Sequence, residues 1–220
     1  MAEPLGFGAR LDVWAIVVAA GEGRRFGSAK QYAMLGGQRV VDRAVEVALR
    51  ATAGVVLVLP PGSPWDGPPV AVVTDGGATR SRSVRAGLAC VPESAEVVVV
   101  HDAARPLASV ALFEAVVEAV VAGAVAAVPG VPVADTLKRA AGGVVTGTLD
   151  RQGLYAVQTP QAFRAGALRA VHAAGGEATD DAALVEAAGE KVILVAGEDT
   201  NLKLTSAADL AVAAALLGER

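Results

Sequence analysis

Residues 17–30 read VVAAGEGRRFGSAK, and the interpretation of the whole chain starts from this stretch. A run of small and β-branched apolar residues, typical of a buried strand, ends in a glycine-rich turn that carries three cations, Arg24, Arg25 and Lys30. Glycine lets the backbone approach a ligand closely, because no side chain stands in the way. Backbone N–H groups at a strand end, with fixed positive charge beside them, predict a site for a polyphosphate.

The spacing of the glycines separates this loop from two better known phosphate loops. Gly21, Gly23 and Gly27 form Gly-x-Gly-x-x-x-Gly, which is one residue longer than the dinucleotide fingerprint and lacks the Gly-Lys-Ser/Thr ending of a P-loop. A dinucleotide loop seldom needs three cations, since backbone N–H groups and the helix dipole already hold the pyrophosphate. Three cations suit a triphosphate whose charge must be stabilised while it reacts. The alternative is a surface turn with solvated basic residues.

The size and composition of the chain bound its class. The 220 residues, 53% of them hydrophobic, are enough for one large core, so we expect residues 1–220 to form a single domain. The formal charge of −4 gives no reason to expect nucleic-acid binding, and the single cysteine excludes an intrachain disulfide and a cysteine-rich zinc site. The longest uncharged stretch, residues 119–134, contains glycine and proline and is too short to cross a bilayer. We therefore expect a cytoplasmic protein that binds a small anion, with neither a membrane nor a nucleic acid as partner.

Val-rich runs alternate with Ala-rich helical segments along the chain. Continuous Val-rich runs indicate strands that are buried on both faces. The predicted strands are residues 13–19, 55–59, 70–74, 97–101, 125–131 and 192–196, and the predicted helices are residues 40–50, 80–90, 109–122, 164–174, 180–188 and 206–217. The alternation predicts an α/β fold with a Rossmann-like, doubly wound and mostly parallel sheet, in which ligands bind at the carboxyl ends of the strands. Ser206, with Asp209 three residues later, indicates a capping box at the last helix.

One segment interrupts this alternation. Residues 135–140 and 144–148 flank Ala141-Gly142-Gly143, a pattern typical of a β-hairpin with a glycine turn. A two-stranded hairpin has little stability alone in water, so we expect it to pack on something. The residues alone leave two arrangements open: the hairpin protrudes and packs on a second copy of the chain, or it lies flat on its own domain.

The most informative strand end is HDAARP, residues 101–106, at the close of the predicted strand 97–101. A carboxylate at this position, Asp102, suits a contact with Mg²⁺, often through water. Arg105 can grip a phosphate with its forked guanidinium group. Of the two histidines, His101 is interpreted as a positioned structural imidazole and His172 as a helix-surface residue.

Further loops carry polar residues that suit a nucleotide and a second phosphate. In GGATRSRS, residues 76–83, Ser83 can bond a nucleobase edge, whereas Ser81 is interpreted as a helix cap. The remaining segments are DR at residues 150–151, TPQ at 159–161 and NLKLT at 201–205. The chain has no nucleophile elbow, no Cys/His pair at a familiar spacing and no His-Glu-x-x-His. Cations with one acid predict phosphoryl or nucleotidyl transfer, in which positioning and electrostatics lower the barrier.

Taken together, these segments resemble the 2-C-methyl-D-erythritol 4-phosphate cytidylyltransferase family over nearly the whole chain. The loop at residues 17–30 is similar to that family's Ala-Ala-Gly-x-Gly-x-Arg loop followed by Lys-Gln-Tyr, and residues 101–106 match its most specific motif. DTLK, DR, TPQ, TDD and NLKLT, at residues 135–138, 150–151, 159–161, 179–181 and 201–205, follow in the family's order.

The resemblance implies a reaction. The phosphate of methylerythritol phosphate attacks the α-phosphorus of CTP, giving CDP-methylerythritol and pyrophosphate in the non-mevalonate route to isoprenoids, with Mg²⁺ as cofactor. The implied catalytic residues are Arg25 and Lys30, which stabilise the transition state, and Arg151 and Lys203, which position the attacking phosphate. The implied CTP-binding residues are Ala19, Ala20, Gly21, Gly23, Gly77, Ser83 and Asp102, with Asp102 also near the metal. The implied contacts of the sugar phosphate are Arg105, Thr136 and Thr159.

The resemblance also implies a homodimer. In the family the hairpin arm, here residues 132–151, crosses to a partner subunit, so Thr136 and Arg151 would serve the neighbour's site. The chain departs from the family's pattern in two places: its phosphate loop is shorter than in many relatives, and Ala78 stands where an acid is frequent in the base-binding loop. The first departure bears on the reach of the loop lysine, and the second on the selectivity for cytosine.

Three alternatives to this function are kept. A sister enzyme that transfers cytidylyl to ribitol 5-phosphate shares the fold and the CTP loop and differs in the polyol pocket. An NAD-dependent oxidoreductase needs an acid about 20 residues past the loop, and Asp42 falls near that distance but inside a predicted helix. A non-catalytic nucleotide sensor would bind CTP without any turnover.

Overall fold

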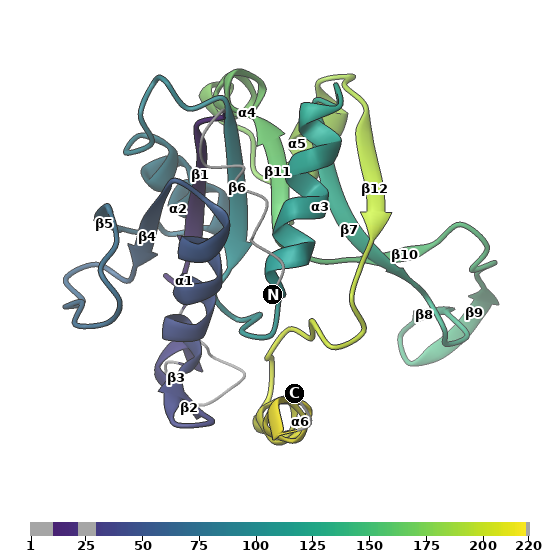
Figure 1. Cartoon of the computed structure of the whole chain (residues 1–220). Helices are drawn as coiled ribbons and strands as arrows, with labels where there is room; N and C mark the ends of the chain where they lie inside the picture. The colour runs from purple at the N-terminus through teal and green to yellow at the C-terminus, as the bar shows by residue number, and fades with distance from the viewer. Residues whose placement is uncertain (1–10, 22–29, 219–220) are drawn as a thin grey trace, which may run out of the picture.

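The computed structural model describes residues 11–21 and 30–218, and an eight-stranded sheet forms its centre (Figure 1). The strand order is β10-β7-β11-β6-β1-β4-β5, and β12 also pairs with β7. The predicted strands are present with small shifts of their ends, as β1 (Val13–Val18), β4 (Gly54–Leu59), β5 (Val72–Asp75), β6 (Val97–Asp102), β7 (Ala126–Pro132) and β12 (Val192–Ala196). β1 pairs in parallel with both β4 and β6, so these strands end at the same edge of the sheet.

The sheet also contains two short strands that the sequence analysis missed. β11 (Gln161–Arg164) lies between β6 and β7 and runs antiparallel to both. β10 (Tyr155–Val157) precedes it and pairs antiparallel with the far end of β7. The four residues of β11, QAFR, are too few to show a strand period, so no local pattern indicates this strand. The predicted mostly parallel sheet is confirmed, with these two strands as the antiparallel part of the described sheet.

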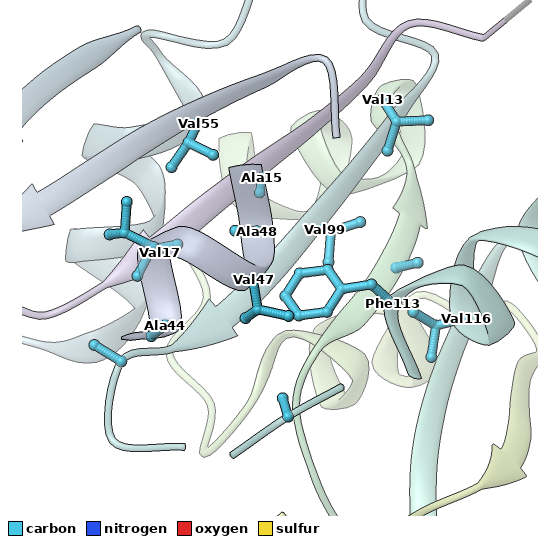
Figure 2. Packing of buried hydrophobic residues seen from close by; sticks show 14 of the residues in the cluster. Val13, Ala15, Val17, Ala44, Val47, Ala48, Val55, Val99, Phe113 and Val116 are labelled. Atoms are coloured by element: carbon cyan, nitrogen blue, oxygen red, sulfur yellow. The ribbon is translucent and has the colours of Figure 1, made fainter. Parts of the chain in front are cut away.

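Helices cover both faces of the sheet. On one face, α1 (Val40–Ala51) and α3 (Val110–Val121) pack against the strands, and Val47 and Phe113 meet Val17 and Val99 there (Figure 2). On the other face lie α2 (Arg80–Leu88), α4 (Ala165–Ala173) and α5 (Asp181–Ala187), whose apolar residues pack on Ile16 and its neighbours. Because side chains alternate along a strand, neighbouring residues of β1 feed two different cores. This confirms the doubly wound arrangement.

A third and smaller cluster supports the C-terminal part of the chain. α6 (Ala207–Gly218) packs near β2 (Met34–Leu35), and Leu204 and Ala213 are buried in the same cluster. β2 follows η2 (Lys30–Tyr32) and pairs with β3 (Gln38–Arg39). The predicted capping box is confirmed, since the Asp209 carboxylate accepts hydrogen bonds from the backbone N–H groups of Thr205 and Ser206, at 2.6 and 2.7 Å. None of the helices in the described ranges combines the length and the apolar character that a membrane span requires.

The predicted hairpin is present and stands away from the sheet (Figure 1). β8 (Lys138–Ala141) and β9 (Val144–Thr148) pair antiparallel, and every residue of both strands is exposed. Gly142 and Gly143 form the turn with φ of 55° and 81°, the left-handed conformation that a two-residue hairpin turn of this type requires at both positions. Of the two arrangements that the sequence left open, the hairpin flat on its own domain is therefore wrong.

Candidate active site

The loops that follow β1 and β5 touch each other at the carboxyl edge of the sheet. Gly76 comes directly after β5, and a Cβ atom on it would lie 2.3 Å from Cβ of Ala20, so no larger residue fits at this approach. The N–H of Gly76 donates to the carbonyl of Leu59 at the end of β4, at 2.7 Å. Ala19 is buried, whereas Gly21 at the start of the phosphate loop is exposed. The fold thus brings together the loops in which the sequence predicted CTP contacts.

The loop from Gly77 to Ser83 is held by its own hydrogen bonds. The Gly77 N–H donates to Oγ of Ser83 at 3.1 Å, and the Ser83 hydroxyl donates to the carbonyl of Thr79 at 3.0 Å. Ser83 is buried, so its hydroxyl shapes the loop that presents Gly77. Thr79 caps α2, and the interpretation of Ser81 as the cap is wrong. Ser81 lies further along the helix and its Oγ accepts the N–H of Ala178, at 3.3 Å.

Asp102 ends β6, and each oxygen of its buried carboxylate faces a cation. Nζ of Lys203 lies 2.6 Å from Oδ2, and Nε of Arg80 lies 3.2 Å from Oδ1. Burial alone would raise the pKa of Asp102, but the charges of Arg80 and Lys203 more than offset this and hold the pKa well below its ordinary value. The carboxylate therefore stays ionised. The side chain of Lys203 is 42% exposed, so the lysine faces the open side of this cluster.

The backbone of Asp102 is held by a chain of hydrogen bonds through Thr159 and His101. Nε2 of His101 lies 3.2 Å from the carbonyl of Arg105, which can only accept, so Nε2 carries the proton. Nδ1 is then an acceptor and takes the hydroxyl proton of Thr159, at 3.2 Å. Oγ1 of Thr159 in turn accepts the N–H of Asp102, at 3.0 Å. Burial lowers the pKa of His101 to about 4, which keeps the ring neutral and this direction fixed.

Arg105 lies just after β6 and binds the segment that contains Lys203. Nη1 of Arg105 donates to the carbonyl of Asn201 at 2.7 Å, and Nη2 donates to the carbonyl of Val157 at 3.3 Å. Asn201 is fully buried and donates to the carbonyl of Thr159 at 3.0 Å. Burial lowers the pKa of Arg105. Three of the predicted motifs, around residues 101–106, 159–161 and 201–205, are therefore one hydrogen-bonded unit.

Arg80 joins this unit to a second buried carboxylate that sequence reasoning missed. Nη1 of Arg80 donates to Oδ2 of Asp181 at 2.7 Å, and Nε2 of His172 donates to Oδ1 of the same carboxylate at 2.9 Å. His172 is 2% exposed and Asp181 is fully buried. The interpretation of His172 as a helix-surface residue is therefore wrong. The signal that could have found this pair is the TDD motif at residues 179–181, whose second acid follows the helix cap Asp180.

Two predicted site residues lie elsewhere, on the arm. Thr136 and Arg151 are exposed, near the base of the hairpin and apart from the cluster around Asp102. Arg151 borders an open hollow of about 570 Å³, whose lining residues are Pro132, Val133, Ala134, Asp150, Arg151, Gln152, Gly153 and Leu154. Figure 1 shows the hairpin beyond β7 and β10, on the side of the molecule away from β1.

Part of the predicted phosphate loop lies outside the described residues. This applies to Gly23, Arg24 and Arg25, and for Lys30 the structure describes only the backbone, in the short helix η2. The described residues contain no group of three or more His, Cys, Asp or Glu side chains that could hold a metal ion. Asp102 is thus a single carboxylate, paired with two cations.

Comparison with known proteins shows the family of the chain. The family model for IspD, 2-C-methyl-D-erythritol 4-phosphate cytidylyltransferase, matches residues 13–219. The chain belongs to this family. It is a family of nucleotidyltransferases that use CTP, and the resemblance first noted in the motifs is therefore confirmed.

Individual relatives and solved structures also match nearly the whole chain. A 2-C-methyl-D-erythritol 4-phosphate cytidylyltransferase from Nocardia farcinica is 47% identical over 223 residues, which are 95% of this chain and 95% of that protein. The crystal structure of the enzyme of the same name from Thermus thermophilus has a TM-score of 0.82 at 38% identity, and the match covers 94% of this chain and 98% of that one.

Other relatives are longer. The bifunctional enzyme IspD/IspF from Dinoroseobacter shibae is 46% identical over 222 residues, which are 95% of this chain but 54% of that protein. The chain thus spans about half the length of the bifunctional relatives that it matches and nearly all of the Nocardia protein.

Proposed function

We propose that this chain transfers the cytidylyl group of CTP to 2-C-methyl-D-erythritol 4-phosphate and releases pyrophosphate, in the non-mevalonate route to isoprenoids. The observation that carries the proposal is the contact of Lys203 with Asp102 at the carboxyl end of β6, in a chain of the cytidylyltransferase family. It joins a cation and an acid at the strand edge where open α/β sheets bind ligands.

The reaction needs charge stabilisation more than it needs covalent help. An oxygen of the substrate phosphate bonds to the α-phosphorus of CTP while the bond to the bridging oxygen breaks, and pyrophosphate leaves with that electron pair. Negative charge grows on the leaving group and on the equatorial oxygens. We assign Arg25 and Lys30 to these oxygens and Lys203 to the attacking phosphate, because preorganised donors at developing charge lower such barriers most.

The nucleoside half of CTP would lie on the loops after β1 and β5. We assign Ala19, Ala20, Gly21, Gly23 and Gly77 to backbone contacts with cytosine and ribose, and Ser83 to the support of Gly77. The approach of Gly76 to Ala20 supports this assignment, because it leaves a narrow, side-chain-free edge. Asp102 would lie near the ribose.

For the sugar phosphate we assign Arg105 and Thr159 to one side of the pocket. The polar atoms of Thr159 bond to His101 and Asp102, and the Arg105 guanidinium bonds to two backbone carbonyls. Both residues would therefore act first by fixing the pocket wall. Thr136 and Arg151 would approach from the arm of a partner.

Mg²⁺ fits this site only together with the substrate. Magnesium in such enzymes is held by one or two carboxylates plus substrate phosphates, and keeps several waters. The described residues offer one carboxylate, Asp102, whose oxygens already face Arg80 and Lys203. We therefore propose that Asp102 contacts a Mg²⁺ ion that arrives with CTP, where the ion would neutralise phosphate charge.

We further propose that residues 1–220 are one domain, that the chain works in the cytoplasm, and that it forms a homodimer through residues 132–151. The exposed apolar side chains of the arm support the dimer, since Val144 and Val145 are 68% and 59% exposed. A second copy packed on the arm would bury them and bring Arg151 to a neighbouring site. An exposed apolar hairpin of this kind is typical of an interaction surface.

The test is pyrophosphate release from CTP and Mg²⁺ with each of two acceptors, methylerythritol phosphate and ribitol 5-phosphate. We expect turnover with the first, and we expect Lys203→Ala to lower its kcat at least about a hundredfold. Lys191→Ala, an exposed lysine at the opposite end of the sheet before β12, is the matched control and should leave turnover unchanged. Turnover with ribitol 5-phosphate alone would replace the proposed acceptor, and CTP binding without turnover would indicate a sensor.

The oxidoreductase alternative finds no support in the described residues. Asp42, the acid at the distance expected for ribose binding, lies in α1 and accepts two hydrogen bonds from Arg39, at 2.8 and 2.9 Å. It is not at a strand end.

A further inference from the structure

Arg80 bridges two buried carboxylates that come from distant parts of the chain. Its Nε contacts Asp102 at the strand end, 3.2 Å away, and its Nη1 contacts Asp181 at the start of α5, 2.7 Å away. The two contacts use different nitrogens, so they fix both the position and the rotation of the planar guanidinium. A lysine could bridge two carboxylates, but its ammonium has no planar fork whose rotation the contacts would fix.

Asp181 is itself held in place by His172. Its second oxygen accepts Nε2–H of His172, at 2.9 Å, and both side chains are almost completely buried. Nδ1 of His172 is buried and has no partner within the described part of the chain. A proton on Nδ1 would leave a buried donor unpaired, so Nε2 is the nitrogen that donates to Asp181. His172 therefore holds one oxygen of Asp181 in place and leaves the other to Arg80.

The two cations on Asp102 are held very differently. Arg80 is pinned by Asp181, and burial, which alone would lower its pKa, is outweighed by Asp102 and Asp181, which raise it. Lys203 is 42% exposed and contacts only the carboxylate of Asp102 among the described ion pairs. When a phosphate enters, Lys203 can turn towards it, whereas Arg80 cannot follow.

We propose that Asp181 is a positioning residue, which holds Arg80 to a single contact with Asp102 and so leaves Lys203 as the cation that moves to the substrate phosphate. Without Asp181, the guanidinium is free to turn both of its arms to Asp102 as a bidentate pair. Both oxygens of Asp102 would then be bonded to Arg80, and Lys203 would lose the contact that holds it beside the site. This inference rests on the proposed cytidylyl transfer.

The test is a double-mutant cycle on kcat and KM. Asp181→Asn keeps the shape and removes the charge, and we expect kcat to fall at least about tenfold, as when an outer partner of a functional group is lost, with a smaller change in KM for CTP. In an Arg80→Gln background, the same substitution should change kcat by less than about twofold, because Asp181 acts through Arg80. If the fold-losses in kcat of the two single variants multiply in the double variant, the proposal is overturned. An unchanged kcat in Asp181→Asn would overturn it as well.

The matched control for damage to the fold is Val185→Ala, a fully buried residue of the same helix, α5. It should lower the unfolding midpoint and leave kcat unchanged at a temperature where the protein is folded. If the unsubstituted protein shows no cytidylyl transfer, the proposed function has failed, whereas an active protein with an equally active Asp181→Asn variant defeats only the role of Asp181.

A measurement on the unsubstituted protein keeps the proposal testable if Asp181→Asn does not fold. Nitrogen-15 NMR of the arginine side chains should give separate Nη resonances for Arg80, because pinning at Nε and Nη1 stops rotation of the guanidinium. Arg82, 63% exposed, is the internal reference and should give averaged signals. Averaged signals for Arg80 would overturn the proposal.

Discussion

The strand-end cluster and the hairpin arm carry residues proposed for the same reaction, yet they are held in opposite ways. Asp102, His101 and Asn201 are buried, and each is bonded to neighbours from other segments. On the arm, every residue of β8 and β9 is exposed. The cluster is therefore organised before any ligand arrives, whereas the arm residues need a second surface to place them. Substitutions in the cluster and in the arm should therefore differ in what they disturb.

The largest expected effect is at the strand-end cluster. Lys203→Ala should lower kcat at least about a hundredfold, equivalent to about 3 kcal/mol, because it removes a donor aimed at developing charge. The variant should also have a lower free energy of unfolding, because the buried carboxylate of Asp102 then has Arg80 as its one remaining cation among the described ion pairs. Steady-state kinetics with CTP and methylerythritol phosphate would measure the loss. A fall below tenfold would mean that Lys203 serves only as a partner of Asp102.

The next effect is a pH dependence of stability at His101. Its pKa in the folded protein is about 4, against an ordinary 6.5, so between these values the unfolded chain binds a proton that the folded chain does not. Stability therefore falls as the pH falls, by about 2 kcal/mol between pH 7 and pH 5. Urea unfolding at several pH values would measure this slope. His101→Gln keeps a donor and an acceptor without titrating, and its slope should be flatter; equal slopes would contradict the assignment.

The same contrast explains what the sequence could and could not predict. The Val-rich strands and the glycine turn of the hairpin depend on local pattern, and these predictions are confirmed. β11 depends on its neighbours β6 and β7, since four residues carry no period of their own. The partners of Asp102 likewise come from positions 22 and 101 residues away, and no local spacing encodes them.

His172 shows the limit most clearly. A lone histidine in an Ala-rich helix has the composition of a surface position, but α4 turns it inward to Asp181, which follows nine residues later. The order of the motifs along the sequence was enough to predict which segments form the site. Which of their side chains contact each other depends on the fold.

If the arm serves the partner's site, two impaired variants should complement each other in a mixed dimer. We expect Arg151→Ala to lower kcat at least about tenfold, because a charged contact to the substrate phosphate is lost. If Arg151 serves the partner's site, mixing it with Lys203→Ala gives mixed dimers in which one of the two sites is intact, and about a quarter of normal activity returns. The control mixes each variant with itself. No recovery, with subunit exchange verified by mass spectrometry, would place Arg151 in its own chain's site.

The smallest effect is at the tip of the arm. Gly143 has φ of 81°, so Gly143→Ala should cost about 1 kcal/mol, whereas Gly147→Ala in β9 has open space and no such strain. Because the arm is exposed in the single chain, the unfolding midpoint of the monomer should not move. In the dimer the cost falls on the interface and both arms carry it, so the dissociation constant should rise about thirtyfold. Sedimentation of both variants would measure the dissociation constant of the dimer.

A lower unfolding midpoint of the monomer, with an unchanged dissociation constant, would mean that the hairpin is stabilised by its own chain. The arm would then not depend on a partner, and the contrast with the strand-end cluster would fail.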